Sequence, residues 1–154
     1  MSEVRIVREE RPQDADVRFL QDAIDAYNLE QTKRTEYLLV TFSLRDDDNR
    51  IVGGIVGDIW GDWLYVRVLW LEEERRLQGY GTQLLRAAEE VAIQQGCRNV
   101  YLSTFSFEAP RFYEKLGYEI FGTLEDFPPG HTKFYMRKSL APARGQHASG
   151  YLLP

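Results

Sequence analysis

The chain has 154 residues, of which 44% are hydrophobic and 28% charged, a balance typical of one globular domain with a buried core. Its apolar runs fall well short of the ~20 residues that cross a bilayer, so we expect no membrane span. The net charge of −5 argues against a nucleic-acid partner, because phosphate contact needs a basic surface, and it favours cationic small molecules. The single cysteine, Cys97, excludes an intramolecular disulfide and indicates a reducing, cytoplasmic environment.

The first half of the chain predicts a strand, a helix and an antiparallel meander of three strands. Apolar and polar residues alternate in the first element, apolar residues recur at helical spacing in the second, and β-branched and aromatic residues dominate the last three. The third strand of the meander is apolar on both faces, so we expect it at the centre of the sheet. The expected ranges are a strand at 3–8, a helix at 14–29 and strands at 37–44, 51–60 and 63–71.

A loop with two glycines follows the central strand. It reads Arg76-Leu77-Gln78-Gly79-Tyr80-Gly81 and leads into a helix expected at 82–95, which Gly96 ends. Such a loop leaves backbone N–H groups converging at a helix N-terminus, where the helix dipole also favours an anion. Arg75 adds positive charge. We therefore predict that the pyrophosphate of a nucleotide cofactor binds here.

Taken alone, the two glycines leave three interpretations open. A dinucleotide-binding loop would need a third glycine where Leu84 stands, and a nucleoside-triphosphate loop would need a Gly-Lys-Ser/Thr run, which the sequence lacks. A tight turn between strand and helix, with no ligand, also fits the pattern. The rest of the chain has to decide between them.

The second half predicts a helix, a parallel strand, a short helix and a final hairpin. The helix after the glycine loop has one apolar face, and its residues Glu89, Glu90, Gln94 and Gln95 are expected to face water. A strand–helix–strand crossover makes the strand at 99–103 parallel to the central strand. The remaining elements are a helix at 109–116, strands at 118–124 and 132–138, and a loose tail at 141–154 outside a single domain of residues 1–140.

In this order of elements, and in two segments, the chain resembles small bacterial members of the GNAT superfamily of acetyl-CoA-dependent N-acetyltransferases. One segment is the loop from Arg76 to Gly81, which fits the family's Arg/Gln-x-x-Gly-x-Gly/Ala pattern. The other is Ala109-Pro110-Arg111-Phe112-Tyr113-Glu114-Lys115-Leu116-Gly117-Tyr118, which fits Ala-x-x-Phe-Tyr-x-x-x-Gly-Phe/Tyr. The resemblance implies an α/β fold with a mixed, mostly antiparallel sheet flanked by helices, in which the strands at 63–71 and 99–103 are parallel and splayed.

The resemblance also implies a reaction and roles for residues. Acetyl-CoA would be the co-substrate, with no metal, and the acetyl group would pass to a primary amine by direct attack. Tyr113 would protonate the departing thiolate, the N–H of Leu71 would stabilise the oxyanion, and the backbone of Leu69 and Leu71 would pair with the pantetheine arm. Further cofactor contacts are implied for Arg76, Leu77, Gln78, Gly79, Tyr80, Gly81, Thr82, Ser106 and Tyr113. A packing role for Tyr113 beside Phe112 is the alternative.

The general base stays open at this stage. Some family members have a glutamate where this chain has Tyr65, and a phenol with a reference pKa of ~10 is a poor base near neutral pH. The alternatives are Asp58, Asp62, Glu72 and His131, or a chain of water molecules. The acceptor is expected to be a small-molecule or peptide amine.

Two departures from the family pattern support a second hypothesis. Tyr65 replaces the possible base, and Ser106 stands where many members have an asparagine that touches the cofactor. A non-catalytic module that binds or senses acyl-CoA would tolerate both changes. Strand edges also make a homodimer possible.

Overall fold

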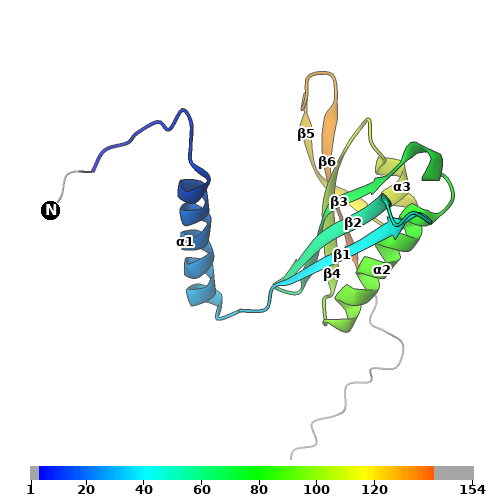
Figure 1. Cartoon of the computed structure of the whole chain (residues 1–154), viewed down its shortest axis with the longest axis horizontal. Helices are drawn as coiled ribbons and strands as arrows, with labels where there is room; N and C mark the ends of the chain where they lie inside the picture. The colour runs from blue at the N-terminus through cyan, green and yellow to red at the C-terminus, as the bar shows by residue number, and fades with distance from the viewer. Residues whose placement is uncertain (1–3, 141–154) are drawn as a thin grey trace, which may run out of the picture. The chain divides into compact units, whose positions relative to one another are not determined.

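The computed structural model describes residues 4–140 (Figure 1). The chain divides into two compact units, one ending at Thr35 and the other beginning at Glu36. The predicted tail at 141–154 lies outside the described residues. No helix among the described residues has the length and apolar character that crossing a membrane requires.

The N-terminal unit contains one helix, α1 (Asp14–Thr32). Acidic side chains in its first turn match the positive end of the helix dipole, and Lys33 ends it in the left-handed conformation (φ 55°). The predicted helix is therefore confirmed. The strand predicted at 3–8 is wrong, because residues 4–9 form neither helix nor strand, and Val4 and Ile6 are exposed. Alternation gives a segment two faces, but a strand also needs a neighbour for its N–H and C=O groups.

The second unit is built on one six-stranded sheet with the order β1-β2-β3-β4-β6-β5. The neighbours β3 and β4 are parallel, and all the other neighbouring pairs are antiparallel. This confirms the predicted mixed sheet, with the strand before the glycine loop, β3, at its centre. The strands are β1 (Leu38–Arg45), β2 (Ile51–Trp60), β3 (Trp63–Leu71), β4 (Asn99–Phe105), β5 (Glu119–Glu125) and β6 (Thr132–Ser139).

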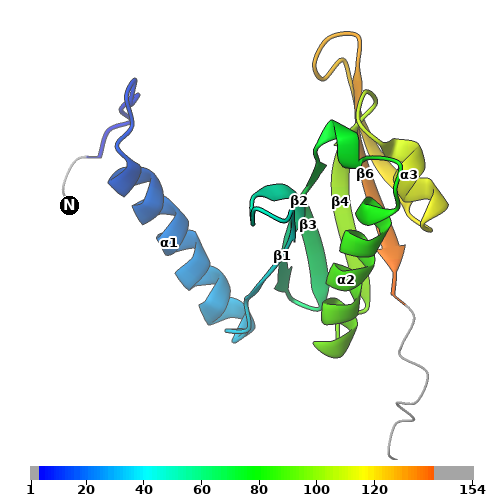
Figure 2. The ribbon, with the colours of Figure 1, turned by 45° about the vertical axis from the view of Figure 1, so that its right-hand side comes forward.

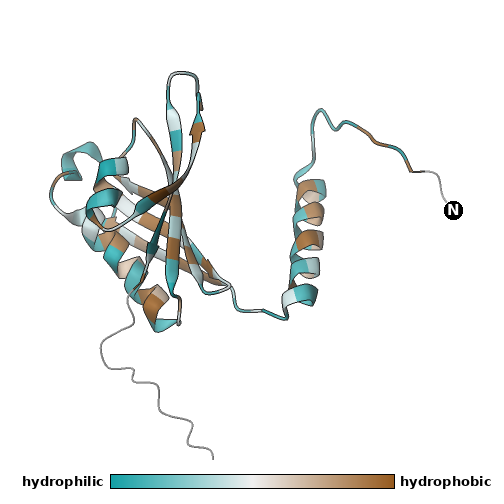
Figure 3. Ribbon diagram, turned by 180° about the vertical axis from the view of Figure 1, so that it is seen from behind, coloured by the Kyte–Doolittle hydropathy of each residue, from teal (hydrophilic) through white to brown (hydrophobic). Residues whose placement is uncertain are grey.

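Two helices lie on one side of this sheet, α2 (Tyr80–Gln94) and α3 (Pro110–Lys115), as Figure 2 shows. A short 3-10 turn, Glu73–Arg75, connects β3 to the glycine loop. Apolar segments of α2 and of the strands alternate with polar ones along the ribbon (Figure 3), and the apolar side chains form the core. Fully buried members of that core are Ile55, Leu64, Leu85, Ala88, Ala92, Val100 and Met136.

Glu89 of α2 corrects one expectation, because its side chain is buried instead of facing water. Its Oε1 accepts hydrogen bonds from the Tyr118 hydroxyl at 2.7 Å and from Lys138 Nζ at 3.0 Å, and its Oε2 accepts from the same Nζ at 3.0 Å. A carboxylate can be buried when a cation and hydrogen bonds compensate for its lost hydration. Helical spacing predicts on which face of α2 Glu89 lies. It does not predict that Lys138 of β6 and Tyr118, just after α3, donate hydrogen bonds to it.

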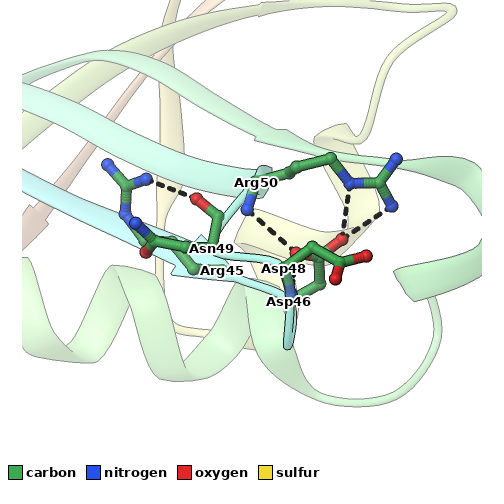
Figure 4. Close-up of polar contacts among 5 residues, drawn as sticks. All are labelled: Arg45, Asp46, Asp48, Asn49 and Arg50. Atoms are coloured by element: carbon green, nitrogen blue, oxygen red, sulfur yellow. Dashed lines mark hydrogen bonds and ion pairs between the residues drawn. The ribbon is translucent and has the colours of Figure 1, made fainter.

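The aspartate-rich connection between β1 and β2 is a hydrogen-bonded turn (Figure 4). Asp46 Oδ1 accepts from the N–H groups of Asp48 (3.0 Å) and Arg50 (2.9 Å), and Oδ2 accepts from Arg50 Nε and Nη2 at 2.9 and 2.7 Å. The N–H and guanidinium of Arg50 hold the pKa of Asp46 below its usual range. The turn prediction is confirmed.

Backbones of neighbouring strands come unusually close at the glycines of β2. A Cβ atom on Gly57 would lie 2.8 Å from the carbonyl oxygen of Tyr65, and one on Gly54 would lie 2.8 Å from that of Phe42. These distances leave no room for a side chain, which confirms that the glycines permit a close approach.

Candidate active site

The strands β3 and β4 separate along part of their length. They pair as far as Val66 and Leu102, although β3 continues to Leu71 and β4 to Phe105. The register between β2 and β3 shifts at Arg67, which has no partner in β2. A bulge of this kind bends and twists its strand, so it accounts for the divergence of β3 from β4. The predicted splayed pair is confirmed.

The splay leaves one backbone edge of β3 open. The N–H of Glu72 donates to the carbonyl of Val52 at 2.9 Å, and backbone groups in an antiparallel ladder alternate in direction. Counting back from Glu72, Leu71 and Leu69 therefore direct their N–H and C=O groups away from β2. Arg76 Nε donates to the Leu71 carbonyl at 3.2 Å, as this direction requires. The N–H groups of both leucines and the Leu69 carbonyl thus lie at the open edge, whereas the Leu71 carbonyl already accepts from Arg76.

The glycine loop presents unpaired amides at the start of α2. Gly79 is the N-cap residue with φ 86°, and no side chain caps the helix. Among the described residues, no acceptor takes a hydrogen bond from the amides of residues 77–82. A Cβ atom on Gly81 would lie 3.3 Å from Phe112 Cζ, so this part of the loop also packs tightly against α3. Consecutive unpaired amides at the positive end of a helix fit a pyrophosphate, as predicted.

Two cavities open beside these backbone groups. The first, of about 440 Å³, joins the end of β3 to the glycine loop and to α3. The second, of about 660 Å³, lies between the diverging ends of β3 and β4. Both are bordered by Leu69, Trp70, Leu71, Arg76, Ala109 and Tyr113. Of the predicted cofactor contacts, the first cavity brings together Leu69, Leu71, Arg76, Leu77, Gly79, Gly81, Thr82 and Tyr113.

Three predicted contacts lie outside both cavity linings. Gln78 and Tyr80 belong to the stretch of unpaired amides, but their side chains line neither cavity. Ser106 joins β4 to β6, since its Oγ accepts from the Thr132 N–H at 3.1 Å and its own N–H donates to the Thr132 carbonyl at 2.8 Å. The structure therefore does not bring the short Ser106 side chain to the cavities.

Tyr113 borders both cavities and is itself buried. Its ring packs edge-on against Phe112, with centroids 5.1 Å apart, and against Tyr118 at 5.7 Å. Burial raises the pKa of Tyr113 to about 12, and the negative charge of Glu108 adds to the effect. The phenol is therefore protonated near neutral pH and can donate a proton into the cavity, while its ring also serves as packing.

The base candidates from the sequence lie elsewhere. Asp58 accepts a hydrogen bond from the Tyr37 hydroxyl and forms an ion pair with Arg67 at 2.7 Å. Tyr65 stacks on Tyr101, with ring centroids 4.6 Å apart. None of Asp58, Asp62, Tyr65, Glu72 and His131 lines either cavity.

Glu108, which the sequence reasoning missed, is the one carboxylate among the residues that line these two cavities. Its signal in the sequence is faint, because it precedes Ala109 in a segment whose recognised pattern begins at that alanine. The residues at 4–140 contain no group of three or more His, Cys, Asp or Glu side chains placed to hold a metal ion.

A sheet opened between two parallel strands, next to a helix N-terminus with unpaired amides, is suited to an extended ligand that carries phosphate groups. Residues 4–118 match the model of the acetyltransferase (GNAT) family, and the chain belongs to that family. It is therefore an acyltransferase of the GNAT type, a class that uses acetyl-CoA.

Individual relatives agree with the family assignment. The chain is 34% identical over 119 residues to an acetyltransferase of Agrobacterium fabrum, covering 77% of this chain and 87% of the relative. It is 36% identical over 91 residues to the blasticidin-S acetyltransferase of Streptomyces morookaense, covering 58% and 67%. A crystal structure of an acetyltransferase from Bacillus cereus superposes with a TM-score of 0.76 at 31% identity, covering 87% and 98% of the two chains.

Proposed function

We propose that this enzyme transfers an acetyl group from acetyl-CoA to the primary amine of a small molecule by direct attack. The observation that carries the proposal is the splay itself, where the backbone edge of β3, the glycine-loop amides and the Tyr113 hydroxyl border adjoining cavities. Acetyl-CoA supplies an activated thioester, whose acetyl carbon accepts the amine nitrogen as the bond to sulfur breaks.

The chain's own groups divide the work between binding and chemistry. The amides of residues 77–82 suit the pyrophosphate, and the open backbone groups of Leu69 and Leu71 suit the amides of the pantetheine arm, in the manner of an added strand. The Leu71 N–H points toward the same edge and would donate to the thioester oxygen as it gains negative charge. Tyr113 would give its proton to the sulfur as that atom leaves.

Charge and kinship support a cationic small-molecule acceptor. The net charge of −5 attracts amines that are protonated at neutral pH. One relative is a blasticidin-S acetyltransferase, so acetylation of an antibiotic amine is among the activities to test.

Two further features concern the compartment and the assembly. Cys97 is a buried thiol whose pKa is raised by burial, and it suits a reducing cytoplasm. The exposed Ile120, Phe121 and Leu124 on the edge strand β5 suit a homodimer.

A screen of acceptors tests the proposal. The protein is mixed with acetyl-CoA and single amines, including blasticidin S, aminoglycosides, polyamines, amino acids and peptides. Free thiol and the mass of each amine are then measured. We expect thiol release and amine acetylation in equal amounts for at least one small-molecule amine. Acetylation confined to peptides would overturn the small-molecule acceptor, and release of thiol without acetylated amine would overturn amine transfer.

A further inference from the structure

We propose that Glu108 binds the ammonium group of the acceptor and takes its proton before the amine attacks. This inference rests on the proposed function and assigns the base that the sequence left open. A primary amine that is protonated at neutral pH has no lone pair to attack with, so an enzyme that uses such acceptors needs a place for that proton.

The first support is position. The larger cavity, between β3 and β4, is lined by Glu108 and Tyr113 together. No other residue of either cavity lining carries a carboxylate. The negative charge of Glu108 also acts on the phenol of Tyr113, so the proposed base and the proposed acid face one space.

The second support is the way the carboxylate is held. Glu108 Oε2 accepts hydrogen bonds from Thr104 Oγ1 at 3.0 Å and from the Phe105 N–H at 2.9 Å, and the Glu108 N–H donates to the Phe105 carbonyl at 2.9 Å. Within residues 4–140, Oε1 receives no hydrogen bond from the protein. One oxygen is therefore anchored while the other can meet a ligand.

The third support is the aromatic surface beside the carboxylate. Phe105 and Phe107 stack with ring centroids 5.1 Å apart and an angle of 7°, and both line the larger cavity. The Lys133 ammonium already lies over the Phe105 ring, 5.4 Å from its centroid, so an acceptor cation would meet Phe107 and the Glu108 carboxylate, which adds a counter-charge. The combination fits an alkylammonium group better than a neutral nucleophile.

The other charged or titratable groups around this cavity have roles of their own. Arg67 is ion-paired with Asp58, and Arg76 donates to the Leu71 carbonyl. His131 packs edge-on against Phe107 with centroids 4.9 Å apart. None of these three is a carboxylate that lines the same cavity as Tyr113.

The proton and electron balance is as follows. The ammonium gives one proton to Glu108, and the freed lone pair forms the bond between nitrogen and the acetyl carbon. The carbon–sulfur bond breaks, its electrons pass to sulfur, and Tyr113 gives the thiolate a proton. The second proton lost by nitrogen restores the Tyr113 phenol, and Glu108 returns the first to solvent. The net products are an amide, a thiol and one proton.

The test compares Glu108→Gln with the wild type on two acceptors. Glutamine keeps a carbonyl oxygen for the bonds from Thr104 and Phe105, so the turn should persist, but it has neither charge nor basicity. One acceptor is an alkylamine identified in the screen, which is protonated at neutral pH. The other is a small alkoxyamine, which is unprotonated there. Glu114→Gln, an exposed change on α3, is the matched control.

We expect Glu108→Gln to lower turnover about 100-fold with the alkylamine and less than fivefold with the alkoxyamine. The loss with the alkylamine should shrink as the pH rises toward the pKa of that amine. Coenzyme A affinity and the control variant should match the wild type. Equal losses with both acceptors, or no loss with either, would overturn the role of Glu108. A screen in which the wild type acetylates no amine would instead overturn the proposed function itself.

Discussion

Removing the Tyr113 hydroxyl tests proton donation by this residue without changing the packing of its ring. Tyr113→Phe deletes one oxygen from a buried ring whose edge-on contacts with Phe112 and Tyr118 stay in place. The Tyr113 hydroxyl makes no hydrogen bond to another described residue, so its loss should change the free energy of unfolding by less than about 1 kcal/mol. The variant should therefore fold normally and bind coenzyme A as the wild type does.

The expected loss of turnover follows from the acidity of the phenol. With its pKa raised to about 12, Tyr113 holds its proton at neutral pH, but it is a weak donor toward a thiolate. Its contribution to the rate should therefore lie toward the lower end of the roughly 10²–10⁴-fold that general acids typically supply. We expect turnover to fall about 100-fold, which corresponds to about 2.7 kcal/mol in the transition state.

The assay is thiol release at saturating acetyl-CoA and amine, with coenzyme A affinity measured by titration calorimetry. Tyr118→Phe is the matched control, since it also removes a buried phenol oxygen, but one that donates to Glu89 at 2.7 Å. That control should lose about 2 kcal/mol of stability, since its hydroxyl donates to a charged group, and keep turnover within about twofold. Unchanged turnover in Tyr113→Phe, with unchanged affinity, would refute the proton-donor role.

Three further predictions concern the core, the pH range and the glycine loop. Glu89→Leu leaves the ammonium of Lys138 without its counter-charge and should lower the free energy of unfolding by about 3 kcal/mol, or Tm by about 6–12 °C. The double variant Glu89→Leu with Lys138→Met should recover most of this loss. Thermal melts in which the losses of the two single variants simply add in the double variant would contradict the buried pair. Burial, with the charge of Glu89, raises the pKa of Tyr118 above its ordinary value of about 10. The stability that the neutral phenol contributes is fully present below that pH and is lost as the pH rises above it. In urea unfolding from pH 8 to 11, the free energy of unfolding should therefore decline less steeply in Tyr118→Phe than in the wild type. Gly81→Val adds a branched side chain 3.3 Å from a phenylalanine ring of α3 and should weaken coenzyme A binding about tenfold, whereas Gly122→Ala, whose Cβ would meet an ordinary contact at 3.8 Å, should leave calorimetric affinity unchanged.

The parts of the fold that were predictable depend on local rules. Glycines at 79 and 81 mark a loop whether or not the rest of the chain is known, because their backbone conformation and packing exclude most side chains. The parallel relation of β3 and β4 follows from the length of the crossover between them. These features are decided within a few residues or by the handedness of the chain.

The misses depend on contacts between distant segments. Alternation at 3–8 predicts a strand, but residues 4–8 form none. The burial of Glu89 depends on Lys138 and Tyr118, which come 49 and 29 residues later. The Ser106 side chain is held by a hydrogen bond from Thr132, and Glu108 lines a cavity that exists only because β3 and β4 diverge. A one-dimensional pattern does not contain these partners.

The site as a whole lies between these two cases. The cofactor half could be predicted because it consists mainly of backbone groups placed by glycines and strand ends. The proposed acceptor half consists of side chains, such as Glu108 and Phe107, whose direction is fixed by a turn and a ring stack. Recognition of the family therefore predicts where the acetyl donor binds, whereas the proposal for the base rests on the structure.

Intact-protein mass spectrometry during the reaction tests direct transfer at the splay most directly. The protein is first incubated with acetyl-CoA alone, and the amine found in the screen is then added. The account predicts no added acetyl mass on the protein in the first step, and equal amounts of thiol and acetylated amine in the second. A protein that carries an acetyl group before the amine is added, and loses it to the amine afterwards, would contradict the account.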